Sequence, residues 1–164
     1  MEQFFFFFIK EFIILGQLLI SMLLGAVIGI DREISGKPAG VRTLMIVSGV
    51  STLFVRLSLE LVSNFHGQVK DAFLADPIRV TVAIVTGISF IGAGSIIRSR
   101  EHEKVEGVTT AATLLLAASI GISVGLSMYV LAVGIAVLSV IILFLFKKLE
   151  LLFDVNKNED IGEE

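Results

Sequence analysis

Long runs without a charged residue are the feature that most constrains this chain. Residues 12–30, 80–97 and 108–146 contain no Asp, Glu, Lys or Arg, and residues 43–63 contain only two. A helix needs about 20 apolar residues, at a rise of about 1.5 Å each, to cross a hydrocarbon layer about 30 Å thick. These lengths predict transmembrane helices rather than a soluble domain.

The last of these runs is too long for a single crossing. Residues 108–146 number 39, and one helix of that length would measure about 58 Å, roughly twice the hydrocarbon thickness. We therefore expect the chain to fold back near residues 121–127. The sequence predicts an all-α integral membrane bundle of five transmembrane helices over residues 1–149. A short acidic tail, residues 150–164, is predicted to be solvated and disordered.

Composition excludes several other classes of protein. Hydrophobic residues make up 55% of the chain and charged residues 18%, below the roughly 25% usual for soluble domains. A net charge of -3 gives no support for a nucleic-acid partner. The chain has no Cys and two separated His, which excludes thiol chemistry and argues against a multi-His metal site. No nucleophile and base stand out as a pair, so we predict neither an enzyme nor a bound cofactor.

Basic residues are distributed unequally between the two ends of the predicted bundle. If the five helices alternate in direction, one end carries the loops at 31–42 and 98–107 and the C-terminal tail. That end has nine Lys and Arg residues, whereas the opposite end has three. Because Lys and Arg accumulate on the cytoplasmic side, we expect the N-terminus outside and the C-terminus in the cytoplasm.

Small residues recur every four positions in three of the predicted helices. Such stripes let helix backbones approach closely in lipid, and the stripe in the fourth helix runs its full length, so we expect that helix to be central. Packing within one bundle and contact between copies in a homo-oligomer both fit the pattern. The stripes are Ser21, Gly25 and Gly29; Thr109, Thr113, Ala117, Gly121 and Gly125; and Ala132 and Ala136.

Charged and hydroxyl residues gather in the predicted cytoplasmic loops. A hydroxyl at the start of the fourth helix can cap it, and a helix start also presents free N–H groups to an anion. With the nearby basic residues, this end could bind a phosphate or an anionic lipid head group, although positive-inside topology alone would produce the same charges. The candidate ligand- or partner-binding residues here are Asp31, Arg32, Glu33, Lys37, Arg42, Arg98, Thr109 and Thr110.

Two further motifs lie in the predicted membrane helices. Three glycines in residues 87–94 cost helicity, which indicates either close packing or a kinked or unwound segment. Gly92 and Gly94 of this motif are further candidate ligand- or partner-binding residues. A charge inside a span is usually paired. Arg56 has Glu60 four residues away on the same helix face as its nearest partner. Asp76 and Arg79 complete this outer charge cluster, which indicates either a structural ion pair or an ion path.

Taken together, these motifs resemble the membrane domain of the MgtC/SapB family, and the chain stops before the soluble C-terminal domain of the longer members. Leu115 stands where the family often has Trp. The matching segments are Asp31-Arg32-Glu33, Gly36-Lys37-Pro38-Ala39-Gly40, Arg42-Thr43, Asp76-Pro77, Arg79-Val80, Gly87-Ile88, Phe90-Ile91-Gly92-Ala93-Gly94, Arg98, Gly107-Val108-Thr109-Thr110-Ala111-Ala112, Ala118 and Ile120-Gly121.

The resemblance implies a bacterial inner-membrane protein of a virulence-related family that acts in magnesium homeostasis or adaptation to low magnesium. A regulatory role, through contacts with a membrane protein such as ATP synthase or a transporter, is the first prediction. Transport of Mg²⁺ or another ion and binding of an anionic ligand are the alternatives. The sequence identifies no metal site, and it leaves the partner and the oligomeric state open.

Overall fold

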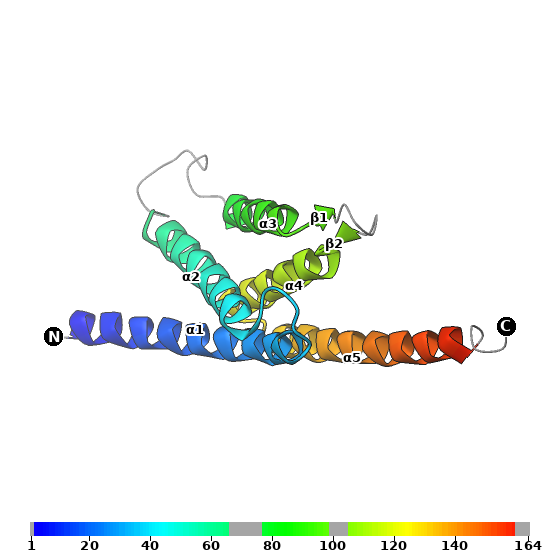
Figure 1. Ribbon diagram of the computed structural model, residues 1–164. Helices are drawn as coiled ribbons and strands as arrows, with labels where there is room; N and C mark the ends of the chain where they lie inside the picture. Colours follow the sequence, from blue (N-terminus) through cyan, green and yellow to red (C-terminus); the bar gives the residue numbers. More distant parts are fainter. Residues whose placement is uncertain (1, 66–76, 99–104, 160–164) are drawn as a thin grey trace.

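A computed structural model describes residues 2–65, 77–98 and 105–159 of the chain (Figure 1). This part contains five α-helices and two short β-strands. In chain order the elements are α1 (Glu2–Ile34), α2 (Val41–Phe65), α3 (Pro77–Gly94), β1 (Ile97–Arg98), β2 (Val105–Glu106), α4 (Val108–Gly125) and α5 (Tyr129–Glu159). The prediction of a helical bundle is confirmed.

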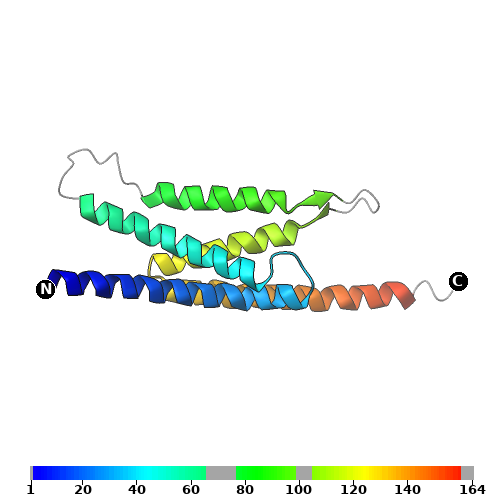
Figure 2. The same ribbon diagram turned by 60° about the vertical axis from the view of Figure 1, so that its left-hand side comes forward.

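Consecutive helices run in alternating directions, as Figure 2 shows most clearly. The connection between α1 and α2, the β1–β2 pair and the C-terminal end of α5 lie toward one end of the bundle. The start of α1 and the α4–α5 turn lie toward the other end. The connections that were counted together as the basic end in the sequence analysis therefore lie at the same end of the bundle.

Three helices are long and apolar enough to cross a membrane. They contain the segments Phe8–Ile34, Val41–Ser63 and Val108–Gly125, whereas the apolar segments Ile78–Gly94 in α3 and Tyr129–Leu145 in α5 are shorter. Apolar side chains such as Leu19, Phe90 and Val130 are exposed on the outside of the bundle. An outside surface of this kind is suited to lipid rather than to water, and the fold is that of a membrane protein.

Several boundaries differ from the sequence predictions. The chain folds back between Gly125 and Tyr129, at the end of the predicted window, because residues 108–125 form one unbroken helix. The loop predicted over residues 98–107 contains an antiparallel pairing of Ile97 with Glu106 and of Arg98 with Val105. The prediction of a disordered tail from residue 150 is wrong as far as Glu159, because the hydrogen-bonded backbone of α5 continues to that residue.

The α4 helix is central, as predicted, and contacts all four other helices. It is held against α2 by glycines: an added Cβ on Gly121 would lie 2.7 Å from the Cβ of Ser51, and one on Gly125 would lie 2.8 Å from the Cβ of Val55. The α1 helix approaches α2 equally closely, because a Cβ on Gly25 of α1 would lie 2.5 Å from the Ser48 hydroxyl. The small-residue stripes therefore pack helices within one chain.

Hydroxyl groups of α2 connect the same three helices. The Ser48 hydroxyl lies 2.7 Å from the carbonyl oxygen of Ser21 in α1, and the Thr52 hydroxyl donates to the carbonyl of Gly121 in α4 at 2.9 Å. Both side chains are completely buried. These bonds form only because glycine lets the backbones approach, so close packing and interhelical hydrogen bonding depend on each other here.

Candidate functional site

The most buried charged side chain in the described part of the chain is Arg32, in the last turn of α1. It is only 4% exposed. Its Nη2 donates to the hydroxyl of Thr110 in α4 at 2.5 Å and to the carbonyl oxygen of Pro38 in the α1–α2 loop at 3.3 Å. We call Arg32, Pro38 and Thr110 the α1–α4 junction. The structure thus joins two predicted site residues that are 78 positions apart.

The loop of the junction is shaped by local backbone bonds. Lys37 N–H donates to the carbonyl of Arg32 at 3.0 Å, and Gly36 and Ala39 have positive φ angles of 62° and 57°. Glycine adopts such angles at little cost, so Gly36 allows the chain to turn directly after α1. This turn brings Pro38 back over the Arg32 side chain.

Glu33 has a different role from its neighbour Arg32. Its Oε2 accepts the N–H of Val41, the first residue of α2, at 3.0 Å. A carboxylate at this position satisfies a free N–H group and neutralises the positive end of the helix. Glu33 is therefore the capping group of α2, a function that the sequence analysis missed.

The start of α4 is not capped by Thr109 or Thr110, which corrects the sequence prediction. The N-cap residue is Gly107, at a φ of 91°, and within residues 2–65, 77–98 and 105–159 no side chain makes a capping hydrogen bond there. Thr110 is instead buried as the acceptor for Arg32, and Thr109 is exposed. Gly107 is required sterically as well, because an added Cβ would lie 2.8 Å from the carbonyl carbon of Ser95.

The remaining predicted residues at this end surround the junction to different degrees. Lys37 and Arg42 are exposed, and Asp31 is half-buried. The backbone of Arg98 lies in β1, but its side chain is outside the described part. Arg32 is buried in the bundle, whereas Lys37 and Arg42 are exposed at its surface.

The glycine motif of α3 shows close packing at one position and open space at the others. A Cβ on Gly92 would lie 3.1 Å from the Cβ of Ala111 in α4, whereas Gly87 and Gly94 have no atom in reach. The helix is continuous from Pro77 to Gly94. The alternative of an unwound segment is therefore wrong, and Gly92 is a contact between α3 and α4.

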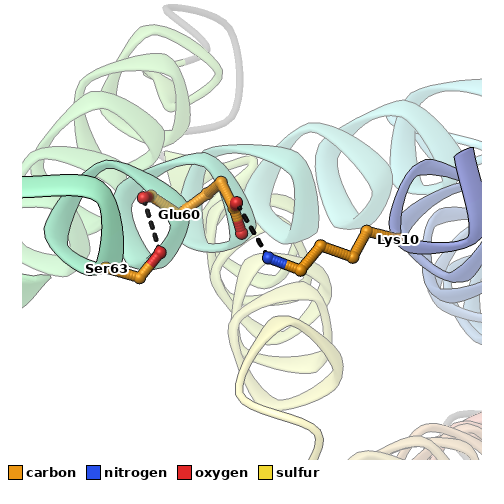
Figure 3. Close-up of polar contacts among 3 residues, drawn as sticks. All are labelled: Lys10, Glu60 and Ser63. Atoms are coloured by element: carbon orange, nitrogen blue, oxygen red, sulfur yellow. Dashed lines mark hydrogen bonds and ion pairs between the residues drawn. The ribbon is translucent and has the colours of Figure 1, made fainter. Parts of the chain in front are cut away.

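The outer charge cluster is paired differently from the prediction. Glu60 forms an ion pair of 3.3 Å with Lys10 of α1, and its backbone carbonyl accepts from Ser63 (Figure 3). Arg56, the predicted partner of Glu60, is half-buried one turn earlier, and Arg79 is exposed in the first turn of α3. Asp76 lies outside the described residues. The helical spacing alone could not reveal Lys10, which is 50 positions away.

A polar cluster at the α4–α5 turn was also missed. The amide nitrogen of Gln17 donates to the Tyr129 hydroxyl at 2.7 Å and to the Ser127 hydroxyl at 3.2 Å. Gln17 is buried, and its Oε1 has no partner among the described residues. An amide within an otherwise apolar span was the available signal, since polar groups at that depth usually have partners.

Acidic and His side chains of the described part do not form a group of three that could hold a metal ion. The polar groups at this end of the bundle instead form the α1–α4 junction. Beside it lie the start of α2, which Glu33 caps, and the start of α4.

This fold and site define an α-helical membrane protein with a buried arginine junction at one end of its bundle. The chain belongs to the MgtC family, whose family model matches residues 18–152, and its apolar helices and relatives indicate a bacterial membrane protein. No solved structure matches it.

Three named relatives illustrate the similarity. The chain is 34% identical to the putative magnesium transporter YhiD of Escherichia coli, over 90% of this chain and 66% of that protein. It is 34% identical to protein SapB of Bacillus subtilis, over 71% and 49% of the two chains. It is 38% identical to protein MgtC of Salmonella typhimurium, over 69% and 43%. The chain therefore spans about half the length of several curated relatives.

Proposed function

We propose that the protein is a five-span inner-membrane protein that acts in magnesium homeostasis by contacting another membrane protein. Its N-terminus is outside and its C-terminus in the cytoplasm, in accord with the unequal distribution of basic residues. Membership of the MgtC family and a relative named as a putative magnesium transporter support the link to magnesium. By resemblance, the partner is ATP synthase or a transporter.

The observation that carries this proposal is the packing where α1, α2 and α4 cross. Gly25 of α1 and Gly121 of α4 both meet α2 at Ser48, and interhelical hydrogen bonds form at the same crossing. The side chains of Ser48 and Thr52 at this crossing are completely buried, while many apolar side chains on the outer faces of the helices are exposed. In lipid, such faces bind either lipid chains or the helices of another protein.

Cross-linking in membranes tests the proposal. Cells that produce the tagged full chain are grown at low and at high magnesium, cross-linked, and subjected to capture and reciprocal capture with tagged ATP synthase. We expect a specific membrane protein to be recovered at low magnesium in both directions. Recovery of none, at a protein level equal in both media, would contradict the proposal.

Ion transport is the second candidate, and the name of the YhiD relative favours it. Mg²⁺ prefers oxygen ligands and keeps several waters, and Asp31, Glu33 and Glu106 supply carboxylates at one end of the bundle. Liposomes that contain the purified chain and a magnesium-sensitive dye distinguish the two candidates. Dye response above that of protein-free liposomes would favour transport over regulation.

A further inference from the structure

The first turns of α2 and α4 lie at the same end of the bundle, but only one is neutralised. A helix start carries roughly half a positive elementary charge and several N–H groups without intrahelical partners. In α2 the carboxylate of Glu33 binds the N–H of Val41. In α4 no side chain of the described residues caps the first turn, and the N-cap Gly107 has no side chain to offer.

Arg32 adds a second positive group beside the uncapped start. Its guanidinium donates to Thr110, in the first turn of α4, and is 4% exposed. Its Nε is enclosed and has no acceptor among the described residues. A cation beside a helix N-terminus is unfavourable, and a buried donor without an acceptor adds to that cost. The neighbouring residue Asp31 is half-buried and carries a carboxyl group.

An exposed hydroxyl lies in the same turn. Thr109, the second residue of α4, is exposed and can donate a hydrogen bond to a ligand at the start of the helix. A tetrahedral oxyanion can accept several of these hydrogen bonds at once and neutralise both positive groups.

We propose that the uncapped first turn of α4, backed by Arg32, binds a phosphate group, from either an anionic lipid head group or a soluble phosphate. This site does not depend on the regulatory function proposed above, because purified protein suffices to test it. The topology proposed above places it at the cytoplasmic surface.

A carboxylate introduced into the chain provides a direct test. Thr109→Asp places a negative charge in the first turn of α4, where it replaces the anion. Thr43→Asp is the matched control: it changes an exposed Thr in the first turn of α2, which Glu33 already caps. Both positions are exposed, so neither substitution disturbs the packed interior.

The first measurement is the Tm of the full chain in neutral detergent, in inorganic phosphate and in chloride of equal ionic strength. At a phosphate concentration about tenfold above Kd, we expect Tm of the unmodified chain and of Thr43→Asp to rise by about 3–6 °C. Thr109→Asp should raise Tm in chloride and abolish the phosphate shift. An equal shift in all three proteins would place the anion elsewhere and overturn the proposal.

The second measurement distinguishes the two sources of phosphate. The three proteins are incorporated into phosphatidylcholine nanodiscs with and without phosphatidylglycerol, and retained lipid is counted by native mass spectrometry. If phosphatidylglycerol is retained by the unmodified chain and by Thr43→Asp but not by Thr109→Asp, the site binds a lipid head group. If inorganic phosphate shifts Tm but no phosphatidylglycerol is retained, the site binds a soluble phosphate. If neither measurement depends on Thr109, the site does not bind phosphate.

Discussion

Replacing Gly121 by Ala tests whether the crossing of α2 and α4 holds the fold together. The added Cβ would lie 2.7 Å from the Cβ of Ser51 and 2.9 Å from the carbonyl carbon of Ser48. Ordinary contact requires these atoms to retreat by roughly 1 Å. Because backbone rather than a flexible side chain must move, α4 as a whole has to shift away from α2.

The cost follows from three contributions. Overpacking a well-packed interior costs about 1–3 kcal/mol, and weakening the bond from Thr52 to the Gly121 carbonyl costs about 0.6 kcal/mol, at most about 1.7. Ala is better than Gly in a helix by about 1 kcal/mol. The net loss is about 2 kcal/mol, which corresponds to a fall in Tm of about 4–8 °C.

Thermal unfolding in detergent, followed by the loss of the monodisperse peak in size-exclusion chromatography, measures this change. Gly87→Ala is the matched control, because an added Cβ there meets no atom within 4 Å. It should leave Tm unchanged or raise it slightly. If Gly121→Ala were as stable as the unmodified chain, or if both variants lost the same stability, the close contact would not be what stabilises the bundle.

Three further predictions follow from other contacts. Lys10→Gln should lower the free energy of unfolding by at most about 1 kcal/mol, because the side chains of the Lys10–Glu60 pair are 61% and 40% exposed. A double-mutant cycle with Glu60→Gln measures this coupling energy, and a value well above about 1 kcal/mol would contradict the prediction. Glu33→Gln should destabilise α2 by about 1 kcal/mol, measured as Tm, since the amide binds the Val41 N–H less strongly. A reporter fused after Glu164 should be active only if it functions in the cytoplasm.

The sequence by itself determined the class of the fold. Charge-free runs whose length matches the bilayer leave helices as the available structure, since backbone groups in lipid must be satisfied within the segment. The excess length of the last run required a fold-back, and the four-residue spacing from Thr109 to Gly125 indicated a central α4. These features are local, so they can be recognised without knowing which helix is the neighbour.

Only the tertiary structure decided which polar groups meet. Arg32 and Thr110 were both candidates, but nothing in their spacing shows that one donates to the other across 78 positions. Glu60 was assigned to Arg56 by helical spacing and instead pairs with Lys10. Periodicity specifies which residues share a helix face, whereas the contact between two faces depends on the register at which whole helices pack. That register is set here by glycines such as Gly25 and Gly121, where the backbones touch.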